Sequence, residues 1–266
     1  MIDPFLGLGA LAMAMLSFAA APSLDPGPSP ECPTDMRLVA GTHHDEIQHL
    51  CVSPRKDPKD THCFVYWEGI TGAEGKQTEI RVCMDQFEAP NRRGTRPFVM
   101  RSYDSAVKWC GQRSKRVCSE QEFELACEGP EHRPLAYGWR VDRKLCNSDK
   151  AWRAFDAAKL SAGGQDTKDE LARLWQGSES GHYLTCVSPF GIYDMMGNVE
   201  EWVSTRKSRR FAGALMGGFW AKPWTGCRGT NDAHETTFTF YETGFRCCAE
   251  PGTLDADGKK IPKKTD

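Results

Sequence analysis

Residues able to bind a metal ion stand at regular spacing in the segment 190–202, FGIYDMMGNVEEW. Four of them fall at i, i+3, i+5 and i+7: Asp194, Gly197, Val199 and Glu201. In an irregular extended loop such residues can turn toward one centre, where the acids offer carboxylate oxygens and the other two offer backbone carbonyls. Calcium prefers a mixed set of roughly six to eight oxygens. The spacing alone is more often that of a turn with solvated acids, with Trp202 in the core.

A second group of candidates is polar and aromatic and follows residue 219. Five of its side chains could bind a ligand, although a solvated loop explains them equally well: Arg228, Asn231, Asp232, His234 and Glu235. Trp220 and Trp224 could line a pocket, but such aromatic residues more often belong to a core. Three clustered histidines could bind iron or zinc, yet an exposed polar loop is the better interpretation: His43, His44 and His49.

Few regular elements are predicted to position these residues. Residues 79–85 alternate between apolar and polar, which predicts a strand. Helices are predicted at 103–111, at 119–129 and, more weakly, at 167–176, and the second opens with a capping-box spacing. After residue 177, glycine, proline and aromatic residues break any period, which predicts long loops. The pattern favours an α+β fold with few long elements.

Length, charge and the N-terminus restrict the class of protein. The chain has 266 residues and a formal net charge of −2, so we expect no nucleic-acid partner and no polybasic membrane patch. The apolar run 5–21 is shorter than the roughly 20 residues that span a bilayer. We interpret 1–21 as a signal peptide, although it lacks the usual basic start; a membrane anchor is the alternative. Residues 22–34 are predicted to be a linker, 35–250 one domain and 251–266 a disordered tail.

The chain contains twelve cysteines, an even number that is spread through the whole sequence. No two of them have the C-x-x-C spacing of a zinc or thioredoxin-type site. Disulfide bonds in an oxidising compartment explain such a set better than twelve free thiols. We therefore expect most cysteines to be bridged in an exported protein, either periplasmic or extracellular.

The segment 190–202 is very similar to G-[IL]-Y-D-M-x-G-N-V-x-E-W, the central motif of the formylglycine-generating-enzyme (sulfatase-modifying factor) family. Other segments resemble the family's motifs in the family's order: DMRLVAG at 35–41, DQFEAPN at 85–91, KRVCSEQEFE at 115–124, YGW and CN within 137–147, GGFW at 217–220 and GFRC at 244–247. The resemblance covers roughly residues 35–249. It implies a single domain related to C-type lectins, with short strands, two main helices and much coil.

The resemblance favours calcium over the solvated turn. In the family, a structural calcium ion is bound at the positions that match Asp194, Gly197, Val199 and Glu201. We add Asn147 of the Cys-Asn stretch to the expected calcium ligands.

The family's copper oxidases have two reactive cysteines just after the G-G-[SY] strand, and thiolates suit Cu(I). In this chain the first of these positions falls near Lys222, and the second has no counterpart. A lysine ammonium has no lone pair to give a metal. We therefore expect calcium as the cofactor and no copper.

The resemblance also implies disulfide partners. Two pairs match bridges of the family: Cys110–Cys247 and Cys127–Cys227. Such long loops could contribute roughly 4–5 kcal/mol each in the chain-entropy model. Because Cys248 points to the opposite strand face from its neighbour, we pair it with Cys118. Two further pairs are assigned by neighbourhood alone: Cys146–Cys186 and Cys51–Cys63. A reactive pair of the two adjacent cysteines, 247 and 248, is the alternative, although it would be strained.

Two functions remain open. The first is a calcium-stabilised, non-catalytic binding or structural domain, a pseudoenzyme with an unidentified peptide or small-molecule ligand. The second is a metal-dependent oxidoreductase of the same fold, of the formylglycine-generating or non-haem iron type, that uses the same groove. We favour the first because no other catalytic constellation stands out. The expected groove residues are Trp220, Lys222, Trp224, Arg228, Asn231, Asp232 and His234.

Overall fold

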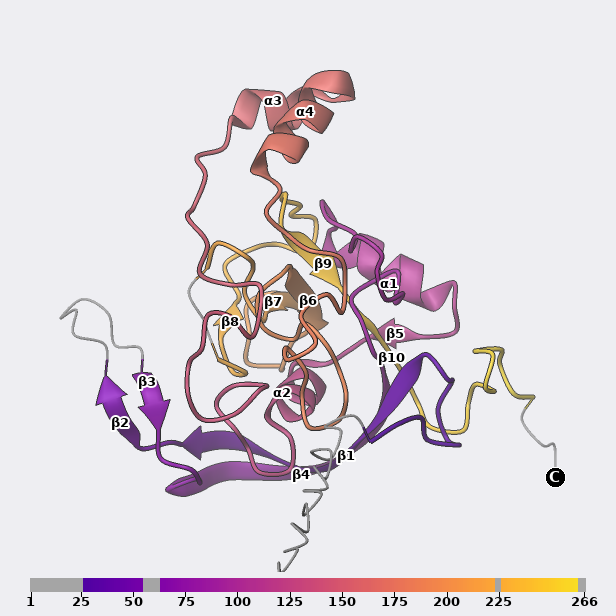
Figure 1. The fold of residues 1–266 in the computed structure, drawn as a ribbon. Coiled ribbons are helices and arrows are strands. Elements are labelled where there is room, and N and C mark those ends of the chain that lie inside the picture. The colour runs from indigo at the N-terminus through magenta and orange to yellow at the C-terminus, as the bar shows by residue number, and fades with distance from the viewer. Residues whose placement is uncertain (1–25, 55–62, 223–225, 263–266) are drawn as a thin grey trace, which may run out of the picture.

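The computed structural model describes residues 26–54, 63–222 and 226–262. Within them, long loops join two four-stranded sheets and a two-stranded hairpin (Figure 1). The first sheet has the strand order β1 (Met36–Gln48), β4 (Gly72–Asp85), β10 (Cys247–Ala249) and β5 (Arg116–Val117). The second has the order β8 (Thr230–Asn231), β7 (Gly213–Met216), β6 (Glu200–Ser204) and β9 (Thr243–Phe245). The hairpin consists of β2 (Cys51–Pro54) and β3 (Cys63–Tyr66). The expected α+β class is confirmed.

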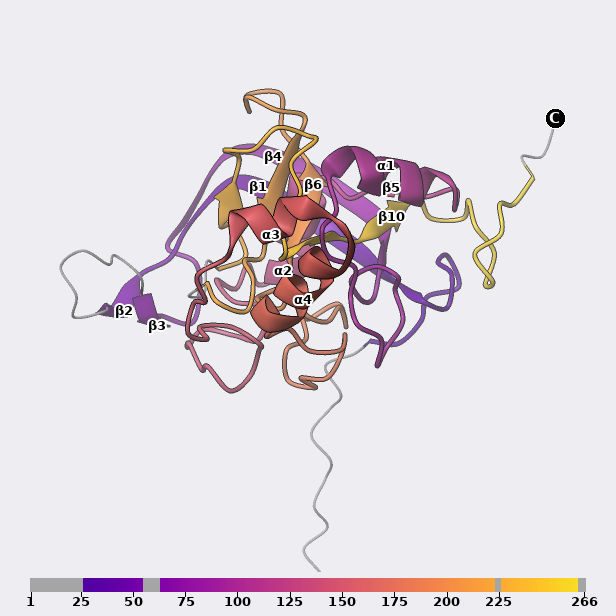
Figure 2. The ribbon, with the colours of Figure 1, turned by 90° about the horizontal axis from the view of Figure 1, so that it is seen from above.

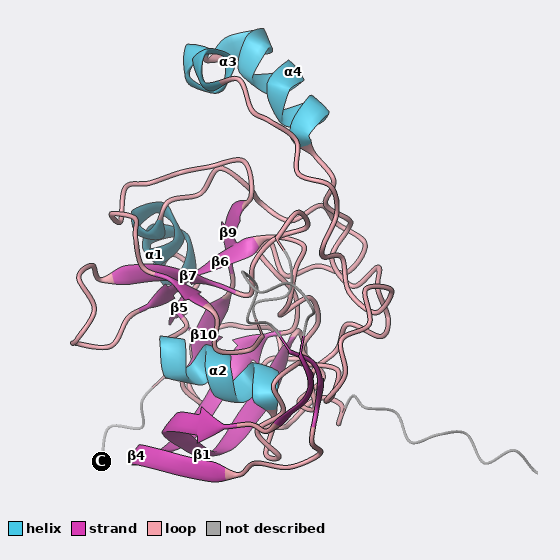
Figure 3. Cartoon of the chain, turned by 90° about the vertical axis from the view of Figure 1, so that its left-hand side faces the viewer, coloured by secondary structure: helices cyan, strands magenta, loops and turns pink. Residues whose placement is uncertain are grey.

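Helix α2 (Glu120–Glu128) lies between the β1–β4 ribbon and the strands β6 and β7 (Figure 3). It begins with the predicted capping box, in which Ser119 Oγ accepts from Glu122 N at 3.2 Å and Glu122 Oε2 accepts from Ser119 N at 2.7 Å. Its Phe123 and Leu125 are fully buried in the main apolar core. Because the helix is buried on nearly all sides, its acidic side chains need partners inside the protein.

Helix α1 (Tyr103–Gly111) begins at the predicted cap, where Ser102 Oγ accepts from Ser105 N at 3.1 Å. Ala106 and Cys110 are fully buried, as the pattern predicts. Val107, expected on the same face, is 44% exposed. The helix lies at the edge of the domain (Figure 1), so only a narrow stripe of it is covered.

The third predicted helix is α4 (Gly164–Leu174), and the short helix α3 (Ala157–Ala162) before it was not predicted. The pair projects from the body of the domain (Figure 1) and in Figure 2 lies over its centre. None of the residues of α3 is buried, so the helix has no apolar period for a pattern to detect. The described residues therefore contain four helices, of which α1 and α2 are the two expected in the body.

All twelve cysteines are paired in six disulfide bonds. Five of these bonds join the expected partners: Cys51–Cys63, Cys110–Cys247, Cys118–Cys248, Cys127–Cys227 and Cys146–Cys186. The sixth, Cys32–Cys83, is additional. It ties the stretch expected to be a linker to strand β4.

The two ends of the described chain pack against each other. Cys32 and Leu254 are buried in one small apolar cluster. Thr34 N donates to Ala256 O at 3.0 Å, and Gly252 N donates to Glu31 O at 2.8 Å. Part of the stretch 251–262, which we expected to be a disordered tail, is therefore held by apolar burial and backbone hydrogen bonds. The predicted signal peptide, 1–21, lies outside the described residues. No helix in the described ranges has the length and apolar content to cross a bilayer.

Candidate functional site

The loop 194–199 is shaped by three residues with positive φ: Asp194 (57°), Gly197 (77°) and Asn198 (57°). A Cβ on Gly197 would lie 2.3 Å from Asn147 O, so only glycine fits this close approach. Asn198 N donates to the same carbonyl at 2.8 Å. The loop and Asn147, both expected in the calcium site, are thus in direct contact.

Two side-chain oxygens here suit a hard cation. Asp194 Oδ2 accepts from Gly181 N at 2.6 Å, whereas its Oδ1 is buried and has no hydrogen-bond partner among the described residues. Asn147 donates to Asn198 Oδ1 at 3.0 Å, and its own Oδ1 is likewise buried without a partner. Carboxylate and amide oxygens are ligands that calcium accepts. Asp194 and Asn147 therefore fit the expected ion.

Glu201 differs from Asp194 and Asn147 because both of its side-chain oxygens accept hydrogen bonds. Its two carboxylate oxygens accept from Arg246 Nε and Nη2, both at 2.6 Å, and both side chains are 1% exposed. This bidentate pair occupies Glu201, which offers no unpaired oxygen to a metal in this arrangement. Within the described ranges, no three His, Cys, Asp or Glu side chains are grouped to hold a metal ion. A calcium ion would therefore need carbonyl oxygens, such as those of Gly197 and Val199.

A third buried acid, Glu88, lies beside these residues, and we did not anticipate it. Ser180 Oγ donates to it at 2.5 Å and Asn198 Nδ2 at 2.7 Å. Burial, followed by the charges of Asp194 and Glu201, raises the pKa of Glu88 well above its usual range. Burial likewise raises the pKa of Asp194 to about 7. Glu88, Asp194, Glu201 and Arg246 form a buried set that we name the Arg246 cluster, in which acids outnumber the guanidinium.

The expected groove residues belong to separate parts of the protein. Lys222 forms an ion pair with Glu200, the first residue of β6. Glu242, just before β9, is near this pair, and burial, then the charge of Glu200, raises its pKa to about 8. Trp220 is fully buried between Trp175 and other rings, so it belongs to the core. Trp224 lies outside the described residues.

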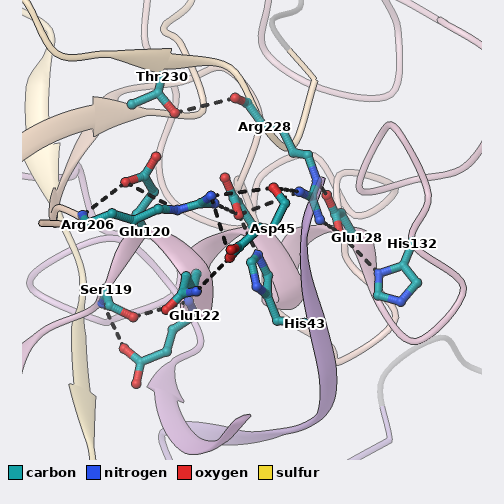
Figure 4. Close-up of polar contacts among 12 residues, drawn as sticks. His43, Asp45, Ser119, Glu120, Glu122, Glu128, His132, Arg206, Arg228 and Thr230 are labelled. Atoms are coloured by element: carbon teal, nitrogen blue, oxygen red, sulfur yellow. Dashed lines mark hydrogen bonds and ion pairs between the residues drawn. The ribbon is translucent and has the colours of Figure 1, made fainter. Parts of the chain in front are cut away.

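Two of the other expected groove residues are linked to acids of α2: Arg228 directly (Figure 4), and Asp232 through Arg209. Arg228 pairs with Glu128, and Arg209 bridges Asp232 to Glu120. Asn231, in β8, accepts at its side-chain oxygen from Ala233 N at 3.3 Å. His234 stacks on Phe238 with ring centroids 3.7 Å apart. Lys222 and Arg228 thus belong to different polar clusters.

Three glutamates spaced one helical turn apart on α2 each face an arginine. Arg209 pairs with Glu120, Arg206 with Glu124 and Arg228 with Glu128. We name these three pairs the α2 ladder. The i, i+4, i+8 spacing places the three carboxylates on one helix face. The sequence carries this spacing, but the arginines come from loops about 80 to 100 residues away, and no local pattern points to them.

In the described part of the chain, the three clustered histidines are not grouped to hold a metal ion. His43, expected in an exposed loop, is instead fully buried in β1, with Nε2 at 2.5 Å from Glu124 Oε2. Strand β1 passes under α2, so an inward position of the strand meets the helix there. His44 packs edge-on against His132 at 5.1 Å, and the Nε2 of His49 is 2.7 Å from His132 O. All three are held by protein groups.

Comparison with known proteins agrees with the motifs. The model of the family described as "Sulfatase-modifying factor enzyme 1-like domain" matches residues 42–251. The chain belongs to this family. The match spans both sheets and every helix of the described structure, so the sulfatase-modifying-factor fold inferred from the motifs is confirmed.

Solved structures show the same fold at low sequence identity. The chain is 16% identical to "Structure of PvdO from Pseudomonas aeruginosa", with a TM-score of 0.51 and coverage of 87% of this chain and 100% of that one. "Crystal Structure of CarF" is 13% identical, with a TM-score of 0.50, and covers 81% of this chain and 98% of that one. A search of curated proteins gives no match. At such identities, the likeness to PvdO and CarF establishes the fold of this sulfatase-modifying-factor domain and nothing finer.

Proposed function

We propose that this chain is an exported, calcium-stabilised binding domain that has lost the copper chemistry of its family. One observation carries the proposal: Lys222, near the position of the first copper cysteine, is paired with Glu200, and every cysteine is in a disulfide. Cys227, the thiol nearest to that position in sequence, is bonded to Cys127. A bridged sulfur cannot act as the thiolate that Cu(I) requires. The six disulfides also support export to an oxidising compartment.

The calcium part of the proposal rests on charge as well as on ligands. Asp194 and Asn147 would supply side-chain oxygens, and Gly197 and Val199 backbone carbonyls. Glu88, Asp194 and Glu201 share Arg246, so two negative charges must otherwise be removed by protonation or left buried at high cost. A divalent cation would offset that excess. In this proposal Glu201 stays with Arg246 and stabilises the site from outside.

The test is the metal content and calcium response of the purified protein. We expect calcium to co-purify, and added calcium to raise the melting temperature after chelation, because a ligand that binds only the native state stabilises it. Asp194→Asn should abolish most of this rise, because it removes the charged ligand. Asp166→Asn, at an exposed acid in the first turn of α4, should leave the rise unchanged.

Two results would contradict the proposal. Stoichiometric copper or iron would support the oxidoreductase alternative instead. So would formation of formylglycine in a peptide containing Cys-x-Pro-x-Arg. A melting temperature that calcium does not change in the wild type would remove the calcium part while leaving the loss of copper chemistry standing.

A further inference from the structure

Two acidic side chains meet where strands distant in sequence run side by side. Glu200 begins β6, which pairs in parallel with β9, and Glu200 N donates to Glu242 O at 3.0 Å. The residue positions 200 and 242 are therefore fixed next to each other by the sheet. Lys222, whose side chain is 33% exposed, reaches this pair and bonds Glu200.

In the described structure, one carboxylate oxygen of this pair accepts no hydrogen bond. Glu242 is 7% exposed, and its Oε2 is buried with no hydrogen-bond partner in the part of the chain that the structure describes. A buried acceptor without a donor costs free energy. The pair holds two carboxyl groups against one ammonium, and the raised pKa of Glu242 keeps that carboxyl mostly protonated at neutral pH when it has no cation of its own. A further ammonium would supply both the missing donor and the missing charge.

Aromatic side chains continue from this site to the surface. Tyr241, next to Glu242, lies 6.5 Å from Phe155 between ring centroids, and Trp152 donates its indole N–H to the Tyr241 hydroxyl. Trp152 is 58% exposed and Phe155 41% exposed, with their rings 6.4 Å apart. Exposed, adjacent aromatic rings favour an aromatic ligand group through offset or edge-to-face contacts.

We propose that Glu242, supported by Glu200, binds the primary ammonium group of a small aromatic amine whose ring packs against Trp152 and Phe155. This rests on the proposed binding function and names its ligand class. The ammonium donates to the vacant oxygen of Glu242, much as Lys222 donates to Glu200. The ring of the ligand covers apolar surface that Trp152 and Phe155 otherwise expose to water.

The experiment compares two probes that carry the same ring and opposite charge, tryptamine and indole-3-propionate, by calorimetric titration of the purified full chain. We expect tryptamine to bind and indole-3-propionate not to bind. Glu242→Gln should weaken tryptamine binding by at least about tenfold, because a charge-assisted hydrogen bond is lost. The variant is expected to fold, because an uncharged glutamine amide replaces a buried carboxyl whose raised pKa already disfavours its charged form.

Two further variants separate a specific site from general attraction to an acidic protein. Glu235→Gln removes an exposed acid seven residues before Glu242 in the chain and should leave tryptamine affinity unchanged. Trp152→Ala changes an exposed ring and should weaken tryptamine by about threefold, which keeps the test decisive if Glu242→Gln is unstable.

Three outcomes would overturn the inference: no binding of tryptamine, preferential binding of indole-3-propionate to Lys222, or equal loss of affinity in Glu242→Gln and Glu235→Gln. Each can be told apart from a failure of the proposed function, because calcium uptake and the absence of copper are measured on the same preparation without either probe. A protein that takes up calcium but ignores tryptamine keeps its proposed function and loses only this site.

Discussion

Two buried polar regions of this domain differ in whether the charges of their carboxylates are balanced by arginines. In the α2 ladder, three glutamates face three arginines, Arg206, Arg209 and Arg228. In the Arg246 cluster, three carboxylates share one guanidinium. A balanced set of charges can be buried as a fixed support, whereas an acid-rich set must bind a proton or another cation. The proposal of a bound cation at the Arg246 cluster therefore rests on this imbalance and not on burial itself.

The pKa directions follow this difference. In the ladder, burial tends to raise the pKa of Glu128, but its hydrogen bonds to His132 and Arg228 outweigh burial and lower it. In the Arg246 cluster, burial dominates, and the pKa of Glu201 stays raised even though Arg246 opposes the shift. The same comparison separates Glu200, which Lys222 pairs, from Glu242, whose Oε2 has no partner within the described residues.

The largest effect is expected from Arg246→Met. The substitution leaves three buried carboxylates without their guanidinium, and breaking a buried ion pair from one side costs about 3–5 kcal/mol. Urea denaturation of both proteins at neutral pH measures the loss in the free energy of unfolding.

The matched control is Arg209→Met in the ladder. Arg209 is 31% exposed, and Arg206 also lies 3.7 Å from the carboxylate of its partner, Glu120. We therefore expect a loss of about 1 kcal/mol. Equal losses in the two variants would show that charge balance does not distinguish the regions.

The next effect is a pH dependence of opposite sign for Asp85, which contacts Arg246, and for Glu128 of the α2 ladder. Asp85, whose backbone oxygen accepts from Arg246 Nη1 at 3.3 Å, is fully buried, and burial raises its pKa from 3.8 to about 6. The native state then binds the proton more tightly than the unfolded chain. The contribution of Asp85 to the free energy of unfolding is therefore greatest below about pH 4. It falls by about 3 kcal/mol as the pH rises through 6.

Glu128 of the α2 ladder should change the free energy of unfolding with pH in the opposite direction. Its pKa is lowered, so its stabilisation is present above the ordinary glutamate pKa and is lost as the pH falls through the lowered value. Chemical denaturation of calcium-free protein between about pH 4 and 7 should show a slope that Asp85→Asn flattens. Glu128→Gln should leave that slope in place and change only the acidic limb. A slope unaffected by Asp85→Asn would contradict the assignment.

The sequence predicted what depends on neighbours along the chain or on recognised motifs. The capping residues Ser102 and Ser119 begin their helices, and the loop 194–199 lies against Asn147 as the motifs led us to expect. Five disulfide pairs could be named because a family bridge, a strand face or proximity in the sequence pointed to each. Each of these signals depends on residues close together in the sequence or on a position within a recognised motif.

Partners that come from distant segments could not be predicted in this way. Arg246 reaches Glu201 across 45 residues, and Glu242 reaches Glu200 only because β6 and β9 pair in parallel. Before the strand order is known, the sequence does not distinguish an acidic residue that is solvated from one in an ion pair, or from one with an oxygen that lacks a hydrogen-bond donor. For the same reason, the sequence could not show that Lys222 and Arg228, six residues apart in the chain, join different clusters.

The smallest effect concerns the start of the ladder. Ser119→Ala removes the oxygen that accepts from Glu122 N, and loss of an N-cap side chain typically costs about 1 kcal/mol. In the same network, Arg116 pairs with Glu122 at 2.6 Å and can hold that carboxylate near Ser119 N. Thermal unfolding should therefore show a modest decrease in the melting temperature and no change in calcium binding. Ser102→Ala, at the cap of α1, is the matched control with a similar loss. A much larger loss for Ser119→Ala would mean that the ladder depends on the exact start of α2, and a loss of calcium binding would mean that the two regions are coupled through the core between them.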